Sequence, residues 1–275
     1  MGKIFDALEK HQKGRSIKVK SFSDMRPEES MFEGHKPSFT KDYYALHKWD
    51  PKVVVLSAPD SVEAENFKIL RTQLLFARDR ERPRTIMVTS SFPGEGKTFV
   101  AVNLAVSLAL GIDEYVLLMD CDLRYPRIHE ILGYGNGEGL HECLTGKKQL
   151  QDLIFRTQIE KLSLLLAGKS PPNPTELLSS AAMRGFLEEI KQRYKDRFII
   201  IDSAPSHITA EAKVLAEYVD GIIFVVMAKR SPREAIRKSI ETLGKNKILG
   251  IVFNGYSQAH NGYYKYYKKY YKGEH

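Results

Sequence analysis

Short apolar runs recur along this chain from Lys52 onward, and segments of helical length and periodicity separate most of them. The runs with the length of strands lie at residues 53–56, 85–89, 115–119, 162–166, 198–201, 221–227 and 248–253. The helical segments include residues 61–79, 97–110, 179–194 and 231–245. Buried parallel strands read as continuous apolar runs because helices cover both faces of their sheet. The pattern therefore predicts an α/β fold, a doubly wound and mostly parallel sheet of about seven strands with helices on both faces.

Both ends of the chain fall outside this pattern. Residues 1–50 are polar, charged and Pro-containing after an opening MGKIFDALEKHQ, which has the apolar spacing of a short amphipathic helix. Residues 256–275 show no core-forming pattern and end in YYKYYKKYYKGEH. We predict a basic, mostly unstructured arm over residues 1–50, a folded domain over residues 51–255, and a flexible Tyr/Lys-rich tail over residues 256–275.

Composition and charge limit the possible binding partners and the cellular location of the protein. Lys and Arg number 42 against 34 Asp and Glu, and much of this excess lies in residues 10–20 and in the tail. Such a balance suits an anionic partner, which could be a membrane surface, a nucleic acid or an acidic protein, or it serves solubility alone. No secretory leader opens the chain, and no apolar run reaches the roughly 18 to 20 residues that span a bilayer. Cys121 and Cys143 form no metal or disulfide pattern. We expect a cytoplasmic protein that can dock at a membrane without crossing it.

The segment SSFPGEGKT, residues 90–98, joins a predicted strand to a predicted helix. Gly94 and Gly96 allow the backbone to close around an anion, and the amides of the loop and of the helix start direct partial positive charge at phosphate. In such a loop Lys97 would reach the β- and γ-phosphates and Thr98 would place its hydroxyl on Mg²⁺. Ser91 stands where the GxxxxGK[ST] pattern has its first glycine, and an ordinary turn before a helix is the alternative. The predicted nucleotide-binding residues of this P-loop are Pro93, Gly94, Glu95, Gly96, Lys97, Thr98 and Phe99.

Carboxylates follow two further predicted strands. Asp120 and Asp122 come after the run at 115–119, and Asp202 comes after the run at 198–201. Open α/β sheets bind ligands at the carboxyl ends of their strands, and a P-loop site needs carboxylates there to hold Mg²⁺ and to position the attacking group. Asp120 and Asp122 would share a face if their strand continues, and Arg124 follows within reach of a phosphate or a neighbouring subunit. The alternative is that one of these residues only caps a loop.

Together these motifs resemble those of the bacterial tyrosine kinases (BY-kinases) of polysaccharide assembly, which share a broad P-loop class with the ParA/MinD ATPases. SSFPGEGKT resembles the Walker A motif of the family, VLLMDCDLR its Walker A′ motif, and FIIIDSAP its Walker B motif. Residues 168–180, GKSPPNPTELLSS, are similar to its GxxPPNPxELL segment. The helix ENFKILRTQL resembles its ExxRxxR subunit-contact motif through Glu65, Lys68 and Arg71, with Lys68 where Arg is usual. The resemblance covers roughly residues 50–271.

The resemblance implies ATP-dependent phosphorylation of tyrosine, largely between subunits. It places Lys97 on the phosphates, Thr98 and Asp202 around Mg²⁺, and Asp120 as a metal contact or general base. Asp122 would orient or share the metal. Asn254 follows the last predicted strand, where this class often contacts the adenine. The tail resembles the autophosphorylation cluster of the family, whose candidate residues here are Tyr263, Tyr264, Tyr266, Tyr267, Tyr270 and Tyr271.

The resemblance also implies partners. It implies a separate inner-membrane polysaccharide co-polymerase that activates the kinase, a homo-oligomer that can be a ring, and a tyrosine phosphatase. The expected location is peripheral at the cytoplasmic face of the inner membrane, and the expected role is regulation of exopolysaccharide chain length and export. Two other interpretations stay open at this point: a ParA/MinD-like ATPase switch without kinase activity, and a nucleic-acid-binding protein that uses its Tyr/Lys tail. Clustered tyrosines favour the kinase, because a switch has no need of them, and nucleic acid is the less expected partner.

Overall fold

The computed structural model describes residues 49–76 and 82–256. Its central sheet has seven strands in the order β3-β4-β2-β5-β1-β6-β7, and all neighbours are parallel except the pair β3 and β4. The strands are β1 (Thr85–Ser90), β2 (Tyr115–Asp120), β3 (Phe155–Arg156), β4 (Leu162–Leu165), β5 (Arg197–Asp202), β6 (Gly221–Met227) and β7 (Ile248–Asn254). This architecture confirms the predicted doubly wound α/β fold.

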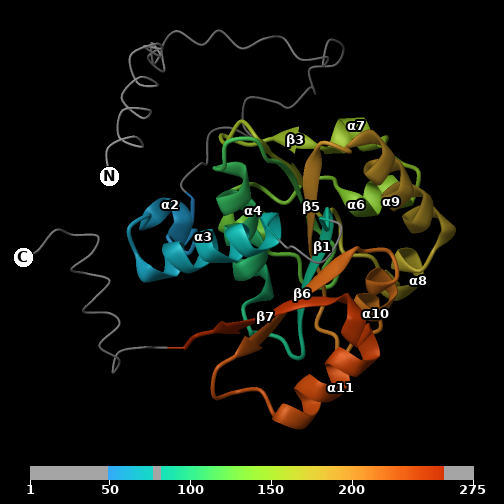
Figure 1. The fold of residues 1–275 in the computed structure, drawn as a ribbon. Coiled ribbons are helices and arrows are strands. Elements are labelled where there is room, and N and C mark those ends of the chain that lie inside the picture. The colour runs from blue at the N-terminus through green and yellow to red at the C-terminus, as the bar shows by residue number, and fades with distance from the viewer. Residues whose placement is uncertain (1–48, 77–81, 257–275) are drawn as a thin grey trace, which may run out of the picture. The chain divides into compact units, whose positions relative to one another are not determined.

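Helices cover both faces of the sheet, as Figure 1 shows. The helices are α2 (Val54–Ser57), α3 (Val62–Leu75), α4 (Lys97–Ala109), α5 (Ile128–Ile131), α6 (Leu140–Leu144), α7 (Leu150–Leu153), α8 (Pro174–Leu178), α9 (Ala181–Arg193), α10 (Glu211–Ala216), α11 (Arg233–Leu243) and the 3₁₀ turn η2 (Lys245–Lys247). Two apolar clusters result. One joins helices α2, α3, α4 and α5 with one face of the sheet, and the other joins helices α6 to α11 with the opposite face. Alternate residues of each buried strand enter each cluster, which is why these strands are apolar throughout.

Helix α4 is the central element of the first cluster, and eleven of its thirteen residues are buried. Its two polar interruptions, Asn103 and Ser107, are both bonded. Asn103 donates to the carbonyl of Lys52 at 2.9 Å and accepts from the amide of Val55 at 3.3 Å. The hydroxyl of Ser107 donates to the carbonyl of Phe67 at 3.4 Å, and the backbone carbonyl of Ser107 accepts from Arg71 at 2.8 Å. Polar side chains within an apolar helix thus attach α2 and α3 to the outer side of α4, because buried polar groups need partners.

The prediction of a strand at residues 53–56 is wrong, because Val54–Ser57 is the helix α2. Val53 and Val55 are buried against α4, and the amide of Val55 bonds to Asn103 rather than to a neighbouring strand. A four-residue apolar run cannot be assigned to strand or helix by periodicity alone, so tertiary contacts decide. The seventh strand is instead β3, a two-residue antiparallel edge that carries no pattern of its own.

The sheet topology brings three predicted motifs to one edge. Strand β5 lies between β2 and β1, so that Asp202 is opposite Asp120 on one side and Val88 on the other. The P-loop follows β1 directly. The predicted arm and tail lie almost wholly outside the described residues, so the predicted domain boundaries stay a prediction. None of the helices that the structure describes is long and apolar enough to cross a membrane.

Candidate nucleotide-binding and active site

The loop between β1 and α4 has the backbone conformation of an anion cradle. Gly94 and Gly96 have φ of 78° and 91°, in the left-handed region that favours glycine, and α4 begins at Lys97. Glu95 is buried and accepts from the amide of Phe92 at 2.7 Å. Its other carboxylate oxygen accepts from the hydroxyl of Ser231, and its carbonyl accepts from Asn254 Nδ2 at 3.0 Å. The loop is therefore fixed by a contact within itself, between Glu95 and Phe92, and by two contacts from other segments: Ser231, which follows β6, and Asn254 at the end of β7.

Replacing Gly96 by alanine is expected to destabilise the fold and weaken nucleotide binding together. A β-carbon there would lie 2.0 Å from Asn254 Nδ2, and φ is already positive. The strain and the displaced side chain should lower the free energy of unfolding by at least about 2 kcal/mol. Chemical denaturation and titration with ADP measure both effects. Gly135→Ala is the matched control, since nothing lies within 4 Å of its β-carbon position. Equal stability of the two variants would contradict this account of the loop.

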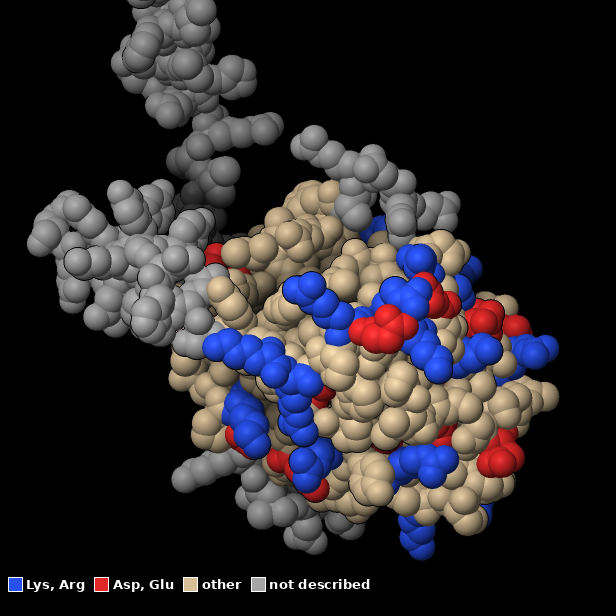
Figure 2. All heavy atoms as spheres, turned by 90° about the horizontal axis from the view of Figure 1, so that it is seen from below, with Lys and Arg blue, Asp and Glu red and all other residues tan. Residues whose placement is uncertain are grey.

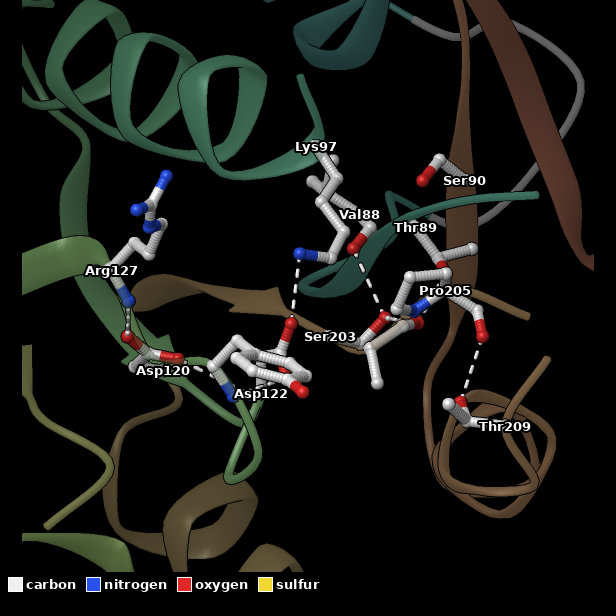
Figure 3. Close-up of polar contacts among 12 residues, drawn as sticks. Val88, Thr89, Ser90, Lys97, Asp120, Asp122, Arg127, Ser203, Pro205 and Thr209 are labelled. Atoms are coloured by element: carbon white, nitrogen blue, oxygen red, sulfur yellow. Dashed lines mark hydrogen bonds and ion pairs between the residues drawn. The ribbon is translucent and has the colours of Figure 1, made fainter. Parts of the chain in front are cut away.

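Asp122 contacts the P-loop lysine at the end of the sheet, and Asp120 lies nearby (Figure 3). Lys97 Nζ lies 2.8 Å from Asp122 Oδ2, with 13% of the lysine side chain and 2% of the aspartate side chain exposed. Asp120 accepts from the amides of Asp122, Arg127 and Ile128 at 3.1 to 3.2 Å. Strand β2 ends at Asp120, so the two aspartates do not continue one strand face. Asp120 instead holds the following loop and the start of α5, while Asp122 faces Lys97.

Asp202 contrasts with these two carboxylates. It is completely buried, and neither of its carboxylate oxygens forms a hydrogen bond of normal geometry with the described residues, although the Thr98 hydroxyl and the Ser203 amide lie near enough to lower its pKa. An orphaned buried carboxylate needs an explanation, and a role as a cation ligand is the simplest one. The hydroxyl-bearing Thr98 at the start of α4 is also buried.

The local pKa shifts follow from this burial. Burial raises the pKa of Asp120 well above its usual range, and the Asp202 carboxylate adds to the shift. Burial also raises the pKa of Asp202 to about 6, against the attraction of the Lys97 ammonium. Burial alone would lower the pKa of Lys97, but the carboxylates of Asp202, Asp122 and Asp120 outweigh it and raise that pKa. Lys97 therefore keeps its charge and neutralises a site that is otherwise acidic.

The donors present fit Mg²⁺ bound together with a nucleotide. Among the residues of ranges 49–76 and 82–256, no group of three or more His, Cys, Asp or Glu side chains could hold a metal by itself. Mg²⁺ usually takes one or two carboxylates and completes its shell with substrate phosphates and water. Asp202, with two unpartnered oxygens, and the Thr98 hydroxyl are suitable protein ligands. Asp120 as a direct ligand stays a prediction, since backbone amides occupy both of its oxygens.

Several contacts at the site have no signature in the sequence. Arg124 pairs with the buried Glu211 at 2.8 Å. Glu211 also accepts from Thr175 at 2.8 Å, which attaches the PPNP segment to the loop after β2. Phe92 of the P-loop packs edge-on against His207, with ring centroids 5.0 Å apart. No sequence motif includes Glu211 or His207. The sequence predicted Ser231 only as the first residue of a helix, and its contact with Glu95 was missed.

The predicted subunit-contact residues lie on α3 and have partners within the chain. Lys68 Nζ lies 3.1 Å from Glu65 Oε2, and Arg71 donates to the carbonyl of Ser107 at 2.8 Å. Their role between subunits stays a prediction. Asn254 contacts the P-loop backbone, and its predicted adenine contact also stays untested. The six candidate tail tyrosines lie outside the described residues.

The chain is similar in sequence to proteins of one family and similar in structure to proteins of one fold. A family model described as an AAA domain matches residues 83–247. The chain is 34% identical over 217 residues to the tyrosine-protein kinase YwqD of Bacillus subtilis strain 168, covering 78% of this chain and 90% of that protein. It is 29% identical to the kinase domain of the Escherichia coli tyrosine kinase ETK, with a TM-score of 0.67 over 76% of this chain and 83% of that one. The septum site-determining protein MinD of Pyrococcus horikoshii OT3, solved with Mg-ADP, is 26% identical with a TM-score of 0.52, covering 64% and 72% of the two chains.

Proposed function

This chain belongs to the bacterial tyrosine-protein kinases, and from that premise we propose that it transfers the γ-phosphate of ATP to tyrosines of its own C-terminal segment. The observation that carries the proposal is the joint placement of the Lys97–Asp122 ion pair and the unpartnered Asp202 beside a glycine-shaped P-loop. A P-loop cradle, one lysine and a free carboxylate are the parts that position a nucleotide with its metal for phosphoryl transfer.

Each residue has a definite task in this reaction. The amides of the P-loop and the start of α4 bind the phosphates. Lys97 exchanges its contact with Asp122 for a contact with the β- and γ-phosphates, and this exchange frees Asp122. Asp202 and Thr98 hold Mg²⁺, which when bound neutralises charge on the phosphates. The tyrosine oxygen forms a bond to the γ-phosphorus as the bond to the bridging oxygen breaks and ADP leaves. The phenol proton passes to a carboxylate, for which Asp120 and the freed Asp122 are the candidates.

The position of the acceptor segment supports its use as substrate. Strand β7 ends at Asn254, whose side chain bonds to the P-loop, so the C-terminal segment leaves the sheet at the edge that carries the site. Six tyrosines and four lysines follow between residues 263 and 275. A fully extended chain spans about 3.5 Å per residue, so this segment is long enough to reach a neighbouring subunit.

A mixing experiment tests transfer between subunits. One chain carries Lys97→Met and intact tail tyrosines, and the other carries an intact P-loop and phenylalanine at all six tail positions. Both are dephosphorylated, mixed with ATP and Mg²⁺, and their C-terminal peptides are weighed by mass spectrometry. We expect phosphate on the tyrosines of the Lys97→Met chain. If that chain stays unmodified while the unmutated protein phosphorylates itself, transfer occurs within one chain. If the unmutated protein also stays unmodified, the autokinase proposal fails.

The same proposal extends to assembly and location. Ile69 on α3 and Phe76 at the C-cap of α3 are 50% and 72% exposed, and such apolar exposure on the helix that carries Glu65 and Lys68 suits a contact with a second copy. A separate membrane protein of polysaccharide assembly would act as activator and hold the kinase at the cytoplasmic face of the membrane. A tyrosine phosphatase would reset the tail. In this setting the phosphorylation state of the tail would regulate the length and export of an exopolysaccharide.

A further inference from the structure

The loop between β6 and α11, residues 228–232, lies against the P-loop. The amide of Ala228 donates to the carbonyl of Asn254 at 2.9 Å, which fixes the start of the loop on β7. The hydroxyl of Ser231 donates to the buried carboxylate of Glu95, which fixes its end on the P-loop. Between these anchors Lys229 adopts φ of 61°, a left-handed conformation that costs free energy in a residue other than glycine. Two fixed ends and one strained residue hold the backbone of the intervening residue, and with it the base of one side chain, beside the P-loop.

That side chain is Arg230, and its guanidinium lies over Gly94. A β-carbon on Gly94 would be 3.2 Å from Nη1 and 3.7 Å from Nη2 of Arg230. The residue is exposed, and none of the carboxylates in the described part of the chain forms an ion pair with it. Lys97, the cation within the P-loop, is by contrast paired with Asp122. The P-loop thus has a second positive group beside it whose charge no nearby carboxylate of the described residues neutralises.

We propose that Arg230 binds oxygens of the nucleotide phosphates held by the P-loop and stabilises the γ-phosphoryl group during its transfer, as an arginine supplied within the same chain. This inference rests on the proposed phosphotransferase function. The charge of the transferring group spreads over its equatorial oxygens, and catalysis consists of positioning and neutralising that charge. A planar guanidinium with two parallel donors suits two oxygens of one phosphoryl group better than an ammonium does. Arg230 itself forms no covalent bond and exchanges no proton.

A merely structural role makes a different prediction. If Arg230 only packed on Gly94, its removal would loosen the loop and weaken ADP and a transition-state mimic equally, and a free guanidinium ion would not replace it. If it binds the transferring group, its removal should spare ADP and affect the mimic, because only interactions stronger in the transition state accelerate the chemical step. Equilibrium binding of ADP and of ADP with aluminium fluoride therefore separates the two roles without a measurement of turnover.

The experiment compares Arg230→Ala and Arg230→Lys with a matched control, Arg233→Ala. Arg233 is the exposed first residue of α11, on the helix that lies at the face seen from below in Figure 2, where basic and acidic side chains are interspersed. We expect Arg230→Ala to bind MgADP within about twofold of the unmutated protein and to bind MgADP–aluminium fluoride at least about 100-fold more weakly. The kcat of Arg230→Ala should fall by a similar factor. Arg230→Lys should recover only a small part of the lost kcat, and guanidinium ion added to Arg230→Ala should restore some activity. Arg233→Ala should match the unmutated protein throughout.

The outcomes separate the two proposals. Unchanged binding of aluminium fluoride by Arg230→Ala, or equal losses for Arg230→Ala and Arg233→Ala, would overturn the role of Arg230 while leaving the kinase intact. Equal weakening of MgADP and the mimic would also overturn it, in favour of packing. Absence of phosphotyrosine from the unmutated protein is instead a failure of the proposed function, and the two binding titrations still decide whether Arg230 contacts the transferring group.

Discussion

Replacing Lys97 by methionine should abolish phosphoryl transfer and destabilise the nucleotide-free protein at the same time. The loss of rate should be at least about 100-fold, because the transferring group loses the stabilisation of one preorganised positive charge. The loss of stability should be about 3 kcal/mol, because Asp122 would remain buried without its partner and Asp202 without its nearest counter-charge. Transfer is measured as phosphotyrosine, and stability by chemical denaturation without nucleotide.

A second substitution separates these two effects. In Lys97→Met with Asp122→Asn, the uncompensated charge is removed as well, so most of the lost stability should return while transfer stays absent. If the double variant is no more stable than Lys97→Met alone, the Lys97–Asp122 contact does not hold the site together in the way described. If it regains transfer, Lys97 is not the phosphate-binding cation.

Replacing Asp202 by asparagine should make the nucleotide-free protein more stable at neutral pH, although it removes transfer. Folding raises the pKa of Asp202 to about 6, so above that pH the folded state carries a buried carboxylate that the unfolded chain solvates better. Asparagine removes this cost, and the gain should be on the order of 1–2 kcal/mol because the amide also lacks a partner. Near pH 4 the aspartate is largely neutral in the folded state and about half ionised in the unfolded chain, so most of the gain should disappear.

Denaturation of both proteins between pH 4 and pH 8, with a metal chelator present, measures this difference. A second titration measures how much Mg²⁺ strengthens nucleotide binding, an effect that should be lost in Asp202→Asn. If Asp202→Asn is less stable than the unmutated protein at pH 8, the account of Asp202 as a buried, unpartnered carboxylate that serves as a cation ligand is contradicted. Stabilisation with no loss of the Mg²⁺ effect would exclude Asp202 as the metal ligand.

The parts of this protein that the sequence predicts well are those with a local physical cause. Fully buried parallel strands must be apolar at every position, so β1, β2 and β4 to β6 could be located from their runs alone. The edge strand β7 is partly exposed, but it also has an apolar run. The P-loop requires glycine where φ is positive, and the lysine and threonine follow at fixed spacing. Asp120 and Asp202 both end apolar runs, and the parallel topology then places them at one edge.

The features that the sequence did not predict depend on contacts between segments that are far apart in the sequence. The run at residues 53–56 has strand propensity, but the amide partner supplied by Asn103 makes it helical. Whether β2 continues past Asp120 was left open by the sequence; the strand ends there, and that aspartate is bonded by the amides of the loop it starts. The contacts of Glu95 with Ser231, separated by 136 positions, and of Arg124 with Glu211, separated by 87, have no local pattern at all.

The central claim is that this chain phosphorylates its own C-terminal tyrosines, and mass spectrometry of its C-terminal peptide tests that claim most directly. Purified protein would be dephosphorylated and incubated with ATP and Mg²⁺, beside the Lys97→Met, Asp122→Asn double variant as a folded and inactive control. The account predicts phosphate on tyrosines between Tyr263 and Tyr271 in the unmutated protein and none in the double variant. A C-terminal peptide that stays unmodified while the protein binds and hydrolyses ATP, with or without the proposed membrane activator, would contradict the account and indicate an ATPase switch.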